Sequence, residues 1–116
     1  METLKEFMLL FRMQTGNAPP SAEQTAAMQQ QWGMYIGNIA AQAKLVNTSR
    51  LGFEGNIIDN STTVNNGTYV ANQETLTGNM LIKAASLEEG TEIAKGCPVL
   101  AMGGTVEVRS IIPMQF

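Results

Sequence analysis

This sequence contains no histidine and only one cysteine, Cys97. A single thiol cannot form an intramolecular disulfide, and a zinc site of the usual kind needs several cysteine or histidine ligands. The sequence therefore excludes both of these stabilising devices and favours a reducing compartment. We expect neither a bound metal nor a cofactor.

Charged residues are also scarce, at 15% of the chain, and with 7 basic residues the formal net charge is −3. Nucleic-acid binding normally requires a clustered positive surface, so we expect no DNA or RNA partner.

The apolar run at residues 7–11 follows the acidic Glu2 and Glu6 and is too short for a signal-peptide core or a membrane span. We therefore expect a cytoplasmic protein that does not bind membranes.

Hydrophobic residues make up 44% of the chain, which is typical of a globular protein. A chain of 116 residues is long enough for one hydrophobic core but too short for two. We expect a single domain over residues 1–116, with no internal repeat.

The clearest local signals lie in the last third of the chain. Ser86 followed by Glu89 is a capping-box pattern, which predicts a helix beginning at Leu87. The helix should end before Pro98, because a proline disfavours helical geometry in the preceding residue. Residues 105–112 then alternate between two faces, as a half-buried strand does.

Apolar periodicity and turn residues predict the remaining elements. Ser21 is a suitable N-cap for the longest helix, and Asn66-Gly67 is the dipeptide best suited to a type I′ hairpin turn. In chain order, the expected elements are a strand at residues 4–12, a helix at 22–45, a strand at 51–59, a hairpin with its turn at 66–67, a strand at 77–84, a helix at 87–95 and a strand at 105–112.

This order of elements predicts an α+β sandwich of the ferredoxin-like type, in which both helices cover one face of an antiparallel sheet. The other face would then be left bare, and the predicted strands supply it with Met, Leu, Ile and Phe instead of charged residues. An exposed apolar face of that size is rare on a soluble monomer. We therefore expect a homodimer in which a second copy covers this face.

Both ends of the sequence resemble one known family. The YCII-related family, also called the DGPF-domain family, has a C-terminal signature similar to SLEEGTEIAKGCPVLAMGGTVEVRSIIP, which begins at Ser86. Its first strand is similar to KEFMLLFR, which begins at Lys5. The resemblance implies a dimeric α/β barrel, in which the sheets of two copies face each other across a two-fold axis.

The family's central tetrapeptide, Asp-Gly-Pro-Phe or Asp-Gly-Pro-Tyr, falls on Asn66, Gly67, Thr68 and Tyr69, and only the glycine and the aromatic residue match. In the family, the aspartate is the residue most often proposed as a site group, alone or paired with a histidine. Here Asn66 takes its place. Because an amide has no pKa suitable for proton transfer, we expect no catalytic residue at this position.

Polar residues on the end strands are the candidates for a ligand site. Glu107 and Arg109 are two residues apart on one strand, so their side chains emerge on the same face. Arg12 ends the first strand, which neighbours the last strand in a ferredoxin-like sheet. We expect these residues, with Asn66 and Tyr69, to bind a small polar or anionic ligand that the arginines anchor. The alternatives are an ordinary charge pair at a sheet edge and, for Arg12, snorkelling at a strand end.

Three functions of different class are compatible with the sequence. The absence of an acid/base pair favours a non-catalytic or weakly catalytic homodimeric module that binds a small molecule in or beside the inter-sheet cavity. The resemblance also allows a cofactor-free enzyme of the dimeric α/β-barrel kind, or an accessory protein in sigma-factor-linked regulation. A buried, perturbed carboxylate in the pocket would favour the enzyme.

Overall fold

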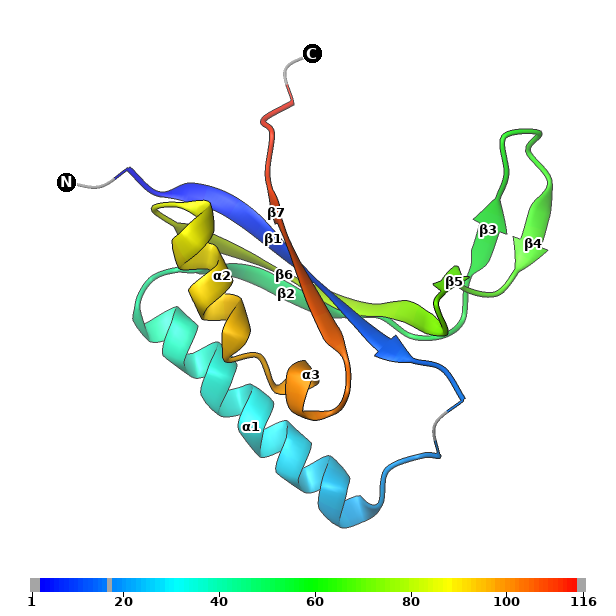
Figure 1. Cartoon of the computed structure of the whole chain (residues 1–116), viewed down its shortest axis with the longest axis horizontal. Helices are drawn as coiled ribbons and strands as arrows, with labels where there is room; N and C mark the ends of the chain where they lie inside the picture. The colour runs from blue at the N-terminus through cyan, green and yellow to red at the C-terminus, as the bar shows by residue number, and fades with distance from the viewer. Residues whose placement is uncertain (1–2, 17, 115–116) are drawn as a thin grey trace.

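An antiparallel sheet runs through the centre of the molecule (Figure 1). The structure is a computed structural model, and it describes residues 3–16 and 18–114. The strands of the sheet are β1 (Lys5–Gln14), β2 (Leu45–Arg50), β5 (Val70–Ala71), β6 (Glu74–Ala84) and β7 (Thr105–Ser110). Their main order is β2-β6-β1-β7, with β5 paired to β6, so the first and last strands are neighbours as expected.

The helices lie together on one side of this sheet (Figure 1). They are α1 (Ala22–Ala41), α2 (Leu87–Lys95) and the short α3 (Pro98–Ala101). The core between helices and sheet consists of ten buried residues, namely Phe7, Leu9, Phe11, Ile39, Met80, Ile82, Ala84, Ala94, Cys97 and Val99. The predicted α+β fold of the ferredoxin-like type is confirmed, and the described residues form an open sheet rather than a closed barrel.

Both long helices begin at the predicted serine caps. At α1, Ser21 Oγ accepts a hydrogen bond from the Gln24 amide at 3.1 Å, and Gln24 Oε1 accepts one from the Ser21 amide at 2.9 Å. At α2, Ser86 Oγ accepts from the Glu89 amide at 3.1 Å, but the Glu89 carboxylate lies 2.8 Å from Lys44 Nζ. The predicted capping box at Ser86 is therefore only half formed, because an ion pair competes for the carboxylate.

The middle of the chain differs from the predicted elements. Helix α1 ends at Ala41 and not at residue 45, because Ala43 takes a left-handed backbone conformation with φ of 58°. The second strand is β2, and of the segment predicted at 51–59 only residues 56–58 form a strand, which lies outside the main sheet. Strand β2 was missed because its sequence, LVNTSR, is polar and mostly exposed at the edge of the sheet.

A separate hairpin follows β2, and its turn also differs from the prediction. Strands β3 (Asn56–Ile58) and β4 (Val64–Asn66) pair only with each other, and we call residues 56–66 the hairpin arm. Asp59 Oδ1 closes the turn by accepting hydrogen bonds from the amides of Ser61 and Thr63, both at 2.9 Å. Asn66 is thus the end of a strand and not part of a turn.

The tight turn with positive backbone torsions lies further along, between β5 and β6. Asn72 and Gln73 have φ values of 54° and 63°, as the central residues of a type I′ turn require. This turn lets β6 begin at Glu74, ahead of the predicted start at residue 77. The other two long strands, β1 and β7, contain most of the segments predicted at 4–12 and 105–112.

The side of the sheet away from the helices, which we call the open face, is mixed in character. Among the strand residues that the register places on it are Met8, Leu10, Arg12, Asn79, Leu81, Glu107 and Arg109. The prediction of a face without charged residues is wrong, because Arg12, Glu107 and Arg109 lie on it. The predicted phenylalanines, Phe7 and Phe11, belong to the core on the helix side instead. The hairpin arm and residues 111–114, which follow β7, extend on the same side of the sheet as the open face (Figure 1).

Candidate functional site

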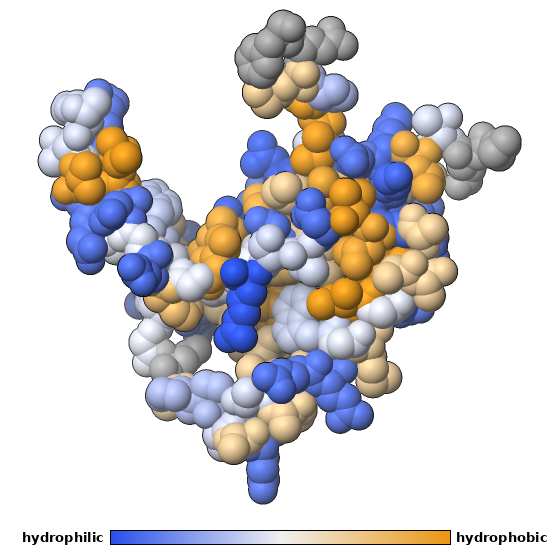
Figure 2. All heavy atoms as spheres, turned by 180° about the vertical axis from the view of Figure 1, so that it is seen from behind, coloured by the Kyte–Doolittle hydropathy of each residue, from blue (hydrophilic) through white to orange (hydrophobic). Residues whose placement is uncertain are grey.

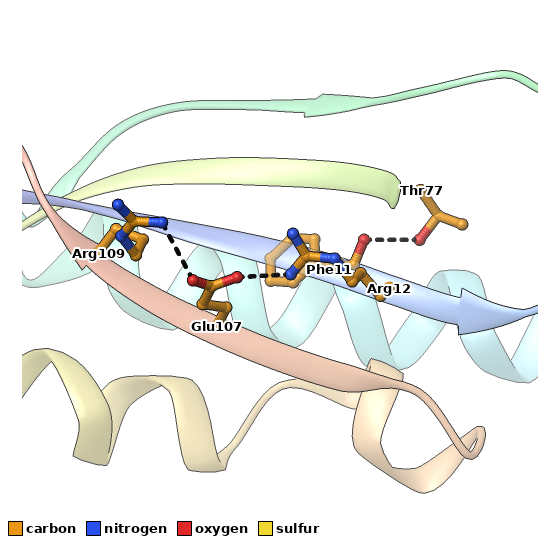
Figure 3. A network of polar contacts seen from close by, with 5 residues as sticks. All are labelled: Phe11, Arg12, Thr77, Glu107 and Arg109. Carbon is orange, nitrogen blue, oxygen red and sulfur yellow. Dashed lines mark hydrogen bonds and ion pairs between the residues drawn. The ribbon is translucent and has the colours of Figure 1, made fainter. Parts of the chain in front are cut away.

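An ion-pair network on the open face joins the first and last strands. Arg12 Nη1 donates to Glu107 Oε1 at 2.7 Å, and Arg109 Nη1 donates to Glu107 Oε2 at 3.2 Å (Figure 3). The three side chains meet because β1 and β7 pair antiparallel, with Leu10 opposite Glu107 and Met8 opposite Arg109. The structure therefore forms the charge cluster that strand alternation predicted.

The two arginines stabilise the charged form of Glu107. Hydrogen bonds from Arg12 first and Arg109 second hold the pKa of this carboxyl below its usual value of 4.5. The side chains of Arg12 and Glu107 are 35% and 41% exposed, so water screens the pair and its net contribution to stability is small. The main effect of Glu107 is to fix the direction of the Arg12 side chain.

A bulge in β6 decides which residues lie beside Arg12. Phe11 pairs with Gly78, but Arg12 pairs with Leu76, so Thr77 is an extra residue in β6. Thr77 Oγ1 donates to the carbonyl oxygen of Phe11 at 3.3 Å (Figure 3). An extra residue reverses the alternation of side chains beyond it. Leu76 therefore joins Arg12 on the open face.

A cavity of about 580 Å³ lies next to Arg12 at the foot of the hairpin arm. One wall comes from the sheet, through Arg12, Glu74 and Leu76. The other comes from the segments that flank the arm, including Leu51, Glu54 and Tyr69. The lining thus combines a guanidinium, two carboxylates, a phenol and apolar side chains, a mixture that can bind a small molecule by both polar and apolar contacts.

A buried threonine fixes the position of Tyr69. Thr75 is 3% exposed, and its Oγ1 donates to the carbonyl oxygen of Tyr69 at 2.7 Å. Thr75 Oγ1 also lies 3.1 Å from Thr68 Oγ1. The Tyr69 side chain itself is 73% exposed, although it lines the cavity. In a single chain the cavity is therefore open to solvent on this side.

The structure brings together only some of the residues predicted for a ligand site. Arg12 and Tyr69 line the same cavity, and Glu107 contacts Arg12. Arg109 is 67% exposed at the far end of the network. Asn66 lies outside the cavity lining, in the hairpin arm, where its Nδ2 donates to Asn56 Oδ1 at 3.3 Å.

Sequence reasoning missed the two carboxylates of the cavity, Glu54 and Glu74. Glu74 directly follows the turn at Asn72 and Gln73, so a correct assignment of that turn would have placed it at a strand start. Glu54 lies in the irregular segment between β2 and the arm. No local pattern marks that segment as part of a site.

A second hollow, of about 790 Å³, lies between α1 and α3 and is lined in part by Tyr35 and Cys97. Cys97 is 3% exposed, and burial raises the pKa of its thiol to about 11. A thiol with a raised pKa is a poor nucleophile at neutral pH. Burial also raises the pKa of Tyr35, whose hydroxyl donates to the carbonyl oxygen of Ile93 at 2.7 Å. Both groups serve packing.

Neither a metal-binding cluster nor a membrane-spanning helix occurs in the described part of the chain. Among residues 3–16 and 18–114, no group of three or more Cys, Asp and Glu side chains is arranged to hold a metal ion. None of the helices in the described part of the chain is long and apolar enough to cross a membrane.

The fold and the cavity together define an α+β protein of ferredoxin-like topology with a polar site at one end of an open sheet face. A model of the YCII-related domain matches residues 7–115, and the chain belongs to this family. No curated protein sequence matches it.

One similar solved structure is the crystal structure of an amidase of the hydantoinase/carbamoylase family from Burkholderia phymatum. The TM-score is 0.29 at 12% sequence identity, and the similarity covers 95% of this chain but 28% of the amidase chain. A likeness this weak says nothing about the activity of the present protein.

Proposed function

We propose that this protein is a homodimeric module that binds a small molecule on its open sheet face, beside the cavity between the sheets of two copies, with little or no catalysis. The observation that carries the proposal is the cavity at the foot of the hairpin arm, where Arg12 is held in place by Glu107 and lines the cavity together with Tyr69 and apolar side chains. A guanidinium fixed in direction is a suitable anchor for a carboxylate.

Binding is favoured over catalysis by the chemistry of the cavity lining. The chain has no histidine, and the cavity lining contains neither cysteine nor serine. The carboxylate beside Arg12, Glu107, is held in its charged form, which suits an ion pair better than proton transfer near neutral pH.

The ligand site that we propose comprises Arg12, Asn66, Tyr69, Glu107 and Arg109. Arg12 and Tyr69 are best placed to touch the ligand from one chain, with Glu107 orienting Arg12. In the proposed dimer, Asn66 and Arg109 reach the ligand from the second copy. The single cysteine is the support for a cytoplasmic location.

Nuclear magnetic resonance titration tests this proposal with two probes, benzoate and inorganic phosphate. Benzoate offers a carboxylate to Arg12 and a ring to Leu51, Leu76 and Tyr69. We expect benzoate at millimolar concentration to shift the amide signals of Arg12, Tyr69 and Leu76, and phosphate to shift fewer of them.

Two variants serve as the test and its control. Arg12→Gln should abolish these shifts, whereas Arg50→Gln, which removes an exposed arginine of β2 outside the cavity lining, should retain them. The proposed site is wrong if neither probe shifts the cavity signals, or if the Arg12→Gln variant responds like the wild type.

A further inference from the structure

The hairpin arm stands apart from the rest of the molecule (Figure 2). Its two strands pair through three residue pairs, with Ile58 opposite Val64, and they belong to a sheet of their own. An isolated two-stranded hairpin is at best marginally stable in water. Something beyond its own pairing is therefore needed to keep such an arm in one position.

Exposed apolar side chains are concentrated on the arm and near its foot. Ile58 and Val64 are 66% and 59% exposed, and Phe53, just before the arm, is 70% exposed. Hydrophobic residues are visible on the arm in the space-filling view (Figure 2). Ile58 and Val64 are a cross-strand pair, so they form one continuous apolar surface.

The total surface of the chain is larger than that of a compact monomer of the same mass. The accessible surface is 8326 Å², whereas a folded monomer of this mass is expected to expose about 6,200 Å². The radius of gyration is 16.0 Å, against about 13.4 Å expected for a compact domain of this length. The excess surface of about 2,100 Å² falls within the range that each copy buries in an obligate homodimer.

The open face alone supplies only part of that excess. With strands about 4.8 Å apart and the outer strands about 20 Å long, its flat area is of the order of 400 Å². The arm extends on the same side of the sheet (Figure 1). A copy seated on the open face would therefore have the arm beside it, and a two-fold axis would use both arms at once.

We propose that the hairpin arm embraces a second copy of this chain, with Ile58 and Val64 packing against the partner while the partner covers the open face. The inference rests on the homodimer in the proposed function. Because Leu51, Glu54 and Tyr69 lie at the foot of the arm and line the cavity, the arm's contact with the partner also closes the ligand site, which stays open to solvent in a single chain.

Sedimentation equilibrium over a range of protein concentrations tests the arm. The variant is Ile58→Ser combined with Val64→Ser. The control is Met34→Ser, which removes a side chain of α1 that is 69% exposed on the helix side of the sheet. We expect the dissociation constant of the dimer to rise at least about tenfold in the double variant, as is usual when apolar anchors at an interface are truncated, and to stay unchanged in the control.

The outcomes separate the two proposals. A wild-type monomer at tens of micromolar would overturn the homodimer and the arm together. A wild-type dimer whose dissociation constant is unchanged in the double variant would overturn the arm alone and leave the proposed function standing. Circular dichroism should show that the double variant keeps its fold. In the wild type, the amides of the arm should exchange hydrogen more slowly in the dimer than after dilution to the monomer.

Discussion

Arg12 and Glu107 are 95 residues apart in the sequence, and their side chains are joined by a hydrogen bond of 2.7 Å. The contact exists because the first and last long strands are neighbours in the sheet. It ties the end of β1 to β7 next to the cavity, so the two ends of the chain contribute to one site. The arginine that we propose as the ligand anchor is thus oriented by a residue from the far end of the sequence.

The first prediction concerns the pH dependence of stability. The folded-state pKa of Glu107 lies below its usual value of 4.5, so its ion pairs stabilise the protein above that pH and are lost as the pH falls through the lowered pKa. Glu107→Gln should lower the free energy of unfolding at pH 7. Between pH 5 and pH 3, the free energy of unfolding should fall less in this variant than in the wild type. Urea denaturation at several pH values measures this. An unchanged pH profile in the Glu107→Gln variant would contradict the prediction.

The second prediction concerns Gly104, where the chain passes close to β1. A Cβ atom at this position would lie 2.5 Å from the Arg12 carbonyl oxygen and 2.7 Å from Val99 Cγ2. Gly104→Ala should therefore lower the free energy of unfolding by about 1–3 kcal/mol. Gly33→Ala is the matched control and should raise the free energy of unfolding. Nothing lies within 4 Å of its Cβ position, and alanine is more favourable than glycine in a helix interior by roughly 1 kcal/mol. Chemical denaturation of both variants checks the pair.

The third prediction concerns the buried threonine behind Tyr69. Thr75→Val keeps the shape of the side chain but removes the donor to the Tyr69 carbonyl oxygen. We expect a loss of about 1–3 kcal/mol in the free energy of unfolding, together with weaker binding of any ligand that contacts Tyr69. Thr75→Ser restores the hydroxyl and should recover most of the binding. Equal binding by all three proteins would show that this hydrogen bond does not position the cavity wall.

The fourth prediction concerns the single thiol. Because Cys97 is 3% exposed and burial raises its pKa to about 11, alkylation by iodoacetamide at pH 7 should be slow in the native protein. Unfolding in urea should restore the rate of an ordinary cysteine. Mass spectrometry of the alkylated fraction against time measures both rates. Fast native alkylation would contradict the packing role assigned to this residue.

The C-terminal third could be predicted from the sequence because its signals are local. Ser86 caps the start of α2, and the helix ends at Lys95, ahead of Pro98 as the proline rule requires; both effects act within a few residues. The middle third could not be predicted in the same way. Ala43 and the Asn72–Gln73 pair adopt positive φ without any glycine, so the sequence carries no strong mark of either break.

The candidate site was predictable only where it depends on strand alternation. Glu107 and Arg109 share a face because they are two residues apart, and Arg12 joins them because the topology makes β1 and β7 neighbours. Glu74 and Leu76 reach the cavity through an irregularity in pairing that no residue type signals. Asn66 was placed by its position in a family motif, and the arm carries it out of the cavity lining.

The bulge at Thr77 makes the cavity tolerant of a change in the length of β6. Because Thr77 is the extra residue, its deletion would leave Leu76 opposite Arg12 and Glu74 opposite Gln14, with both side chains still on the open face. A β6 that kept Thr77 but lost the bulge would instead place Thr77 opposite Arg12 and turn Leu76 to the core side. Among related chains, a one-residue gap at Thr77 would therefore preserve the cavity wall, whereas a strand of full length without the bulge would lose it.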